Sequence, residues 1–222
     1  MMTSDQLIGH IHQLIFEWQR CGLVLDSRNH QAYKRANGIV EVTWGNDGYV
    51  MKNNDYASLD EYCSLIESKQ YSMLLSDGAM IQVSYKFEQK RIVGHRLCWY
   101  PSPIEIDENV DGYSLVDYVL EQMASGNTQY FRARGPLRFD YAPDQAREDH
   151  PVSHLHLGHE DCRIPVKSSL SIRAFMMFIV QNFYPAIIQK AALHAEAAHW
   201  FCADALTEGQ RFRHHLAINH PT

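Results

Sequence analysis

Two short stretches decide the fold: LRFDY at residues 137–141 and VSHLHL at residues 152–157. The first stretch alternates apolar with polar residues throughout and the second does so from His154 to Leu157, at a period of two, which is the period of a β-strand with one face in the core. Antiparallel pairing of the two segments would bring their apolar faces together, and the polar faces must then also coincide. We therefore infer a pair of strands with one apolar and one polar side.

The polar side of this pair is predicted to carry Arg138, Asp140, His154 and His156. Two imidazoles and a carboxylate can hold a first-row divalent metal ion. Alternatively, one imidazole serves as a general acid or base that Asp140 orients, while an arginine stabilises an anion. A third interpretation is purely structural, because Arg–Asp and His pairs also fasten neighbouring strands. The spacing alone leaves all three open.

Three further arginines extend the anion-binding interpretation. Arg132, Arg134 and Arg163 flank the two strands, and guanidinium groups bind phosphate oxygens bidentately. They are the predicted substrate-binding residues for a phosphodiester such as RNA. The acidic residues between positions 140 and 161 nearly balance the neighbouring basic ones, which weighs against a strongly phosphate-binding surface.

Outward from this centre, the chain alternates between helical and strand patterns. The predicted strands are residues 39–44, 79–87, 91–100 and 129–141. Apolar spacings of three and four predict helices at residues 6–21 (capped by Ser4 or Asp5), 59–68 (capped by Ser58), 115–123, 170–184 (capped by Ser168 or Ser169) and 186–206.

This order predicts an α+β fold, in which an antiparallel sheet packs against helices and a long C-terminal helical segment follows. We expect a single domain over residues 1–222. Its sheet part would span residues 1–168, and helices packed on that sheet would span residues 169–222. Pro185 is expected to kink or restart the last helix, because proline lacks the N–H and clashes with the preceding turn.

Composition narrows the class of protein. The chain has 222 residues, 45% of them apolar and 21% charged, with a net charge of −6, which is typical of globular proteins and not of strongly basic nucleic-acid binders. Its longest apolar run, residues 175–180, is too short to cross a bilayer, and residues 1–5 do not resemble a secretory signal. The sequence predicts a cytoplasmic protein without membrane contact. Five scattered cysteines without a CxxC pair argue against a disulfide framework and a thiolate zinc site.

The motifs around the two strands resemble a known family. LRFDY at residues 137–141, HPVSHLHLG at residues 150–158 and RIP at residues 163–165 resemble an uncharacterised bacterial family, catalogued as a domain of unknown function. The pattern FxxFIxxxFY at residues 175–184 resembles the closing helix of that family. The resemblance covers most of the chain and implies no established activity.

A second similarity is to the TumE-like toxins of bacterial toxin–antitoxin pairs, which show an Arg-x-Asp segment followed by a His-rich strand. This resemblance implies toxin or phage-defence biology with RNA as the target. It favours a ribonuclease-like, phosphodiester-acting protein that uses Arg138, Asp140, His154 and His156, with a divalent metal as a candidate cofactor. The chain is longer than those toxins, which favours the alternative of a non-catalytic interaction or regulatory subunit in a larger complex. Either function leaves room for a partner protein or a homo-oligomer.

Overall fold

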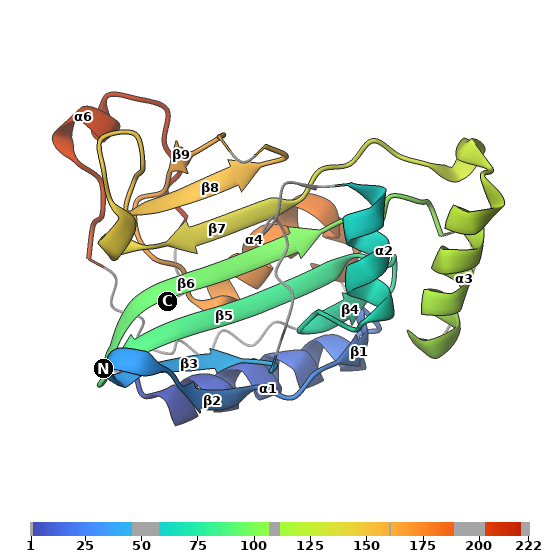
Figure 1. Ribbon diagram of the computed structural model, residues 1–222, viewed down its shortest axis with the longest axis horizontal. Helices are drawn as coiled ribbons and strands as arrows, with labels where there is room; N and C mark the ends of the chain where they lie inside the picture. The colour runs from blue at the N-terminus through green and yellow to red at the C-terminus, as the bar shows by residue number, and fades with distance from the viewer. Residues whose placement is uncertain (1, 46–57, 107–111, 160, 189–202, 219–222) are drawn as a thin grey trace.

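A nine-stranded sheet forms the centre of the part of the chain that the structure describes (Figure 1). The structure is a computed structural model, and it describes residues 2–45, 58–106, 112–159, 161–188 and 203–218. The strands are β1 (Val24–Ser27), β2 (Gln31–Lys34), β3 (Ile39–Thr43), β4 (Met73–Leu75), β5 (Met80–Glu88), β6 (Arg91–Tyr100), β7 (Leu137–Tyr141), β8 (Ser153–Leu157) and β9 (Ile164–Pro165).

Every strand pairing in this sheet is antiparallel, as predicted. The strands follow the order β1-β4-β5-β6-β7-β8-β9, while β3 pairs with the later half of β5 and β2 pairs with β3. The hairpin of β5 and β6 is the longest pairing, and a two-residue turn at residues 89–90 closes it, with Gln89 at a φ of 56°. The predicted antiparallel pairing of β7 with β8 is confirmed.

Six α-helices accompany the sheet in the described part of the chain. The same part also contains three 3-10 helices, η1 (Ala36–Gly38), η2 (Thr128–Tyr130) and η3 (Pro143–Gln145). Thr3 caps the first α-helix, where Ser4 or Asp5 was predicted. Ser171 caps the fourth, where Ser168 or Ser169 was predicted. The α-helices are α1 (Ser4–Arg20), α2 (Leu59–Glu67), α3 (Gly112–Ser125), α4 (Ile172–Phe183), α5 (Pro185–Ile188) and α6 (Glu208–Arg211).

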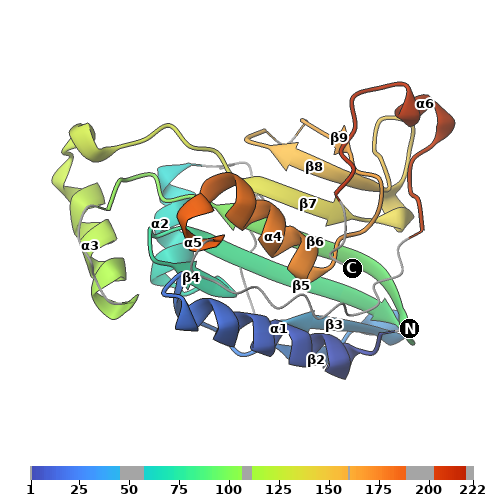
Figure 2. The same cartoon turned by 180° about the vertical axis from the view of Figure 1, so that it is seen from behind.

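Helices α1 and α4 lie side by side across one face of the sheet, as Figure 2 shows from behind. The apolar positions of the central strands point at them and form the main core, which includes Val83, Leu97, Phe139 and Leu155. Helix α2 and part of α3 pack at one end of the opposite face, where a second apolar cluster contains Met80, Cys98 and Tyr100. The rest of that opposite face carries the polar positions of β6, β7 and β8.

The prediction of a long C-terminal helical segment is not borne out in the described residues. Pro185 does restart the helix, but α5 is described only to Ile188, and residues 189–202 of the predicted helix lie outside the described residues. Residues 203–206 have no regular secondary structure, and the backbone N–H of Ala205 donates to the carbonyl of Lys167, which ties this segment to the sheet part.

The predicted strand at residues 129–141 is also too long. Residues 132–136 have no regular structure, and β7 begins only at Leu137, after the Gly135-Pro136 pair. No helix in the described ranges has the length and apolar character that a membrane span requires.

Candidate functional site

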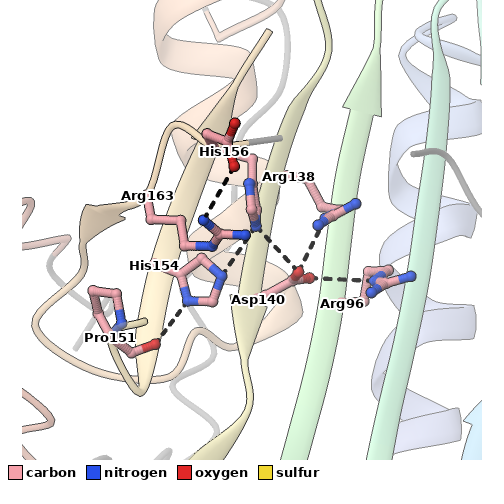
Figure 3. A network of polar contacts seen from close by, with 8 residues as sticks. Arg96, Arg138, Asp140, Pro151, His154, His156 and Arg163 are labelled. Carbon is pink, nitrogen blue, oxygen red and sulfur yellow. Dashed lines mark hydrogen bonds and ion pairs between the residues drawn. The ribbon is translucent and has the colours of Figure 1, made fainter. Parts of the chain in front are cut away.

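The register of three neighbouring strands gathers the predicted residues on one face of the sheet (Figure 3). Asp140 of β7 lies between Arg96 of β6 and His154 of β8, each directly opposite it across a strand pair. Two positions along, Arg138 lies opposite His156. The four residues predicted from alternation therefore occupy two adjacent rows, as the antiparallel pairing requires.

Asp140 accepts hydrogen bonds from two guanidinium groups. The Nε of Arg138 donates to its Oδ2 at 3.0 Å, and the Nε of Arg96 donates to its Oδ1 at 3.3 Å. Burial alone would raise the pKa of this carboxyl, but the charges of Arg138 and Arg96 outweigh burial and hold the pKa below its ordinary value. Asp140 is therefore a carboxylate at neutral pH, with one guanidinium on each oxygen.

The two histidines face each other through their Nε2 atoms, which lie 3.0 Å apart. The Nδ1 of His154 lies 2.8 Å from the backbone carbonyl oxygen of Pro151, so it carries the proton and donates it there, which leaves a lone pair on Nε2. The Nε2 of His156 also lies 3.6 Å from the Oδ2 of Asp140. Burial lowers the pKa of His154 to about 4 and that of His156 to about 3, so both rings are neutral at pH 7.

Burial of this cluster is nearly complete: the exposed fraction is 0% for His154, 2% for His156 and 8% for Asp140. The Nδ1 of His156 is buried and has no hydrogen-bond partner among the described residues. Buried polar atoms without partners are uncommon in folded proteins and often mark a site that holds a ligand or carries out chemistry. The cluster is thus a fully paired carboxylate beside an incompletely paired imidazole.

Arg163 lies over the two histidines in Figure 3 and links the cluster to a cleft. Its charge is among the influences that lower the pKa of His156, and its Nε is buried without a hydrogen-bond partner in the described part of the chain. Arg163 and Pro151, the residue that orients His154, both line a cleft of about 570 Å³. The buried cluster therefore adjoins an open space at Pro151, which bonds to His154, and at Arg163, which lies beside the histidines.

Asp140, His154 and His156 place three potential metal-ligand atoms close together. One ligand atom from each lies within 4.8 Å of the others. Ligand atoms about 2.1 Å from one ion lie roughly 3.0 to 3.4 Å apart at ligand angles of 90 to 109°, and the two Nε2 atoms are 3.0 Å apart. The hydrogen bond from the Nδ1 of His154 to the carbonyl of Pro151 fixes the orientation of the ring, as such contacts do for histidines that bind metals. Two imidazoles with one carboxylate suit a first-row transition ion.

Arg132 and Arg134, predicted to bind substrate, lie before β7 and are not seen in this network. The guanidinium of Arg132 forms an ion pair with Glu105 and donates to the backbone carbonyl of Gln129. Arg134 is exposed and lies close enough to the hydroxyl of Tyr184 to influence its pKa. Of the three predicted arginines, only Arg163 is brought to the histidines, and substrate binding by the other two remains a prediction.

Sequence reasoning missed two members of the cluster, Arg96 and His150. Arg96 occupies a polar position between the apolar residues of β6, but nothing local shows that β6 pairs with β7, which follows it by some forty residues. His150 lies in the turn before β8, and its ring lies edge-on against the ring of His154, with 4.5 Å between the centroids. Two backbone hydrogen bonds between Arg147 and His150 close this segment into a tight turn.

Comparison with known proteins identifies the family but no activity. A family model described as an uncharacterised conserved protein (DUF2290) matches residues 24–218. No curated protein and no solved structure matches the chain. The resemblance to an uncharacterised family is thereby confirmed, whereas the similarity to TumE-like toxins remains a prediction.

Proposed function

This chain belongs to the DUF2290 family of uncharacterised conserved proteins, and we propose that it is a metal-dependent phosphodiesterase of the ribonuclease type. His154, His156 and Asp140 are the proposed metal ligands, and Arg163 is the proposed contact to the phosphate. The role in a bacterial toxin or phage-defence system rests on the similarity to TumE-like toxins alone.

One observation carries the metal-dependent proposal: the Nε2 atoms of two neutral imidazoles face each other at 3.0 Å, and a carboxylate oxygen lies 3.6 Å from one of them. A pair of histidines that works by acid–base catalysis without metal needs one ring protonated to act as the acid. Neither ring here is protonated at neutral pH, since burial depresses the pKa of both. A neutral imidazole coordinates a cation through its unprotonated nitrogen, so metal binding would place the proton of the His156 ring on Nδ1, the atom that has no hydrogen-bond partner among the described residues.

Each residue then has a defined task. A bound divalent ion supplies a Lewis acid and lowers the pKa of a bound water. Arg138 and Arg96 hold the carboxylate of Asp140 in place from both oxygens. Arg163 lies at the border between the cluster and the cleft, where its guanidinium would bind the phosphate oxygens of a substrate that approaches through the cleft.

A cleavage assay tests this proposal. Protein freed of metal with EDTA would be incubated with single-stranded RNA, with and without Mn²⁺, Co²⁺ or Zn²⁺. We expect cleavage only with metal, and a loss of about a hundred-fold or more in His156→Ala, because a ligand is removed. His10→Ala, a histidine change on α1 on the other face of the sheet, is the matched control and should cleave normally. A folded His156→Ala protein that cleaves at the normal rate would refute the proposal.

A second function remains supported by one observation, the complete pairing of Asp140. A carboxylate held by two guanidiniums is also what a purely structural fastening of β6 to β7 would look like. In this alternative the protein is a non-catalytic interaction or regulatory subunit of a larger defence or toxin complex, with a partner protein or a second copy of the chain. Absence of metal binding and of cleavage, with a complex formed in pull-down experiments, would favour it.

A further inference from the structure

The cleft beside the histidines has a firmly held wall formed by the C-terminal segment, residues 203–218. The backbone N–H of Leu216 donates to the carbonyl of Pro165, and the N–H of Lys167 donates to the carbonyl of Leu216. Arg211 forms an ion pair with Asp204 at 2.8 Å across the short helix α6. These contacts fix the residues that immediately follow α6 at the edge of the cleft.

Phe212 is the most unusual residue of this wall. It lines the cleft and is 86% exposed, more than any other large apolar residue in the described part of the chain. An aromatic ring in water costs free energy unless a ligand covers it, and the flat bases of unpaired nucleotides stack well on such rings. Its position next to the held helix α6 gives a ligand a prepared stacking surface.

The cleft carries charges of both signs, and this narrows the chemical class of ligand that it can bind. Arg163 and Arg213 line it together with two carboxylates, Glu148 and Asp149. Two positive and two negative groups do not favour a polyanion such as duplex nucleic acid, which is bound mainly through many phosphates. They suit a ligand that carries both an anionic group and hydrogen-bond donors. A nucleotide has both, a phosphate for the guanidiniums and base N–H groups for the carboxylates.

We propose that this cleft binds one unpaired nucleotide of a single-stranded nucleic acid, with the base stacked on Phe212 and the phosphate between Arg163 and Arg213. This inference deepens the proposed function. It rests on that function for the path of the nucleic-acid strand, which would continue from the cleft toward His156. Glu148 and Asp149 would accept hydrogen bonds from the base edge. Guanine fits them best, since its N1–H and N2–H₂ offer adjacent donors to the two oxygens of a carboxylate.

Fluorescence anisotropy in EDTA tests the cleft separately from catalysis, because no metal is present to support cleavage. The probe is a labelled single-stranded RNA of six nucleotides. We expect Phe212→Ala to weaken binding roughly ten-fold or more, Phe212→Trp to retain it, and Arg213→Gln to weaken it also. The matched controls are Phe16→Ala, at an exposed aromatic residue on α1, and Arg91→Gln, at an exposed arginine at the start of β6. Both controls should bind normally.

Three results would overturn the inference: no binding of the RNA by the unaltered protein, equal binding by Phe212→Ala and Phe16→Ala, or equal affinity for duplex RNA. Guanosine monophosphate should compete better than uridine monophosphate, and equal competition would contradict the role of Glu148 and Asp149. Failure of these tests leaves metal binding and cleavage to be judged by their own assays, since binding in EDTA requires neither. Conversely, normal binding without cleavage would refute only the proposed activity.

Discussion

The two faces of β7 and β8 are buried to nearly the same extent, but one carries apolar side chains and the other carries polar and charged ones. On one face, Phe139 and Leu155 pack against α4 and are 1% and 4% exposed. On the other, Asp140 and His154 are 8% and 0% exposed. Apolar burial stabilises a fold without strict geometry, whereas buried charges cost free energy unless each is paired in a defined position. The polar face is thus the more demanding one to build, and its arrangement calls for a functional explanation.

The apolar face should show the largest effect on stability. The ring of Phe139 meets those of Phe175 and Phe178 edge-on, with centroids 6.0 Å and 5.4 Å away. Phe139→Ala should lower the free energy of unfolding by about 3–5 kcal/mol through lost burial and a cavity. Urea denaturation measures this change. Phe16→Ala, at a residue 60% exposed, should change it by less than about 0.5 kcal/mol. Similar small losses in both variants would mean that this face is not the core.

The polar face should respond to the loss of Asp140, the carboxylate of β7. Asp140→Asn keeps the shape of the side chain but removes the negative charge to which both Arg138 and Arg96 donate. We expect a loss of about 3 kcal/mol in the free energy of unfolding, because removing one partner of a buried ion pair is costly. Denaturation at 0.1 M and 1 M salt checks it. An unchanged free energy of unfolding would show that other groups balance the charges of these guanidiniums.

Acid should weaken the fold through buried neutral histidines, of which His95 is the clearest outside the proposed ligands. Its Nε2 accepts from the backbone N–H of Leu170 at 2.9 Å, and burial lowers its pKa to about 4. A pKa below the ordinary 6.5 means that the unfolded chain takes up the proton first. Stability is therefore complete above pH 6.5 and falls toward pH 4, by at most about 3 kcal/mol from this residue.

The variant His95→Gln gives the comparison for this pH effect. Glutamine does not titrate and offers an oxygen to the N–H of Leu170. The variant should start less stable at pH 7 but lose less stability between pH 6.5 and 4 than the unaltered protein, as followed by thermal unfolding. An identical pH slope in both proteins would assign the acid sensitivity to other groups.

A helix or strand can be predicted from the sequence when its hydrophobic pattern is long enough to show a period. The strands β5, β6, β7 and β8 and the helices α1, α2 and α4 have clear alternation or helical spacing. All were predicted to within a few residues except β7, whose predicted start at residue 129 lies well before Leu137. The strands β1, β2, β4 and β9 have two to four residues each, too few for any periodicity, and tertiary pairing alone defines them.

The candidate site shows the same limit. Alternation was enough to place Arg138, Asp140, His154 and His156 on one face, because register in a buried strand pair is fixed by its apolar side. Arg96 comes from a strand distant in sequence, and Phe212 comes from the C-terminal segment that was predicted to form helices packed on the sheet. Neither carries a local signal, since each is positioned by backbone hydrogen bonds that form only in the folded chain.

Isothermal titration calorimetry with Zn²⁺ or Co²⁺ on the metal-free protein tests the central claim, that the polar face is a metal site, most directly. The account predicts one ion bound per chain, with binding abolished in His154→Ala and retained in His10→Ala. Both variants would first be shown by circular dichroism to fold. Absence of binding by the unaltered protein, or equal binding by folded His154→Ala, would contradict the account and leave the cluster as a fastening of the sheet.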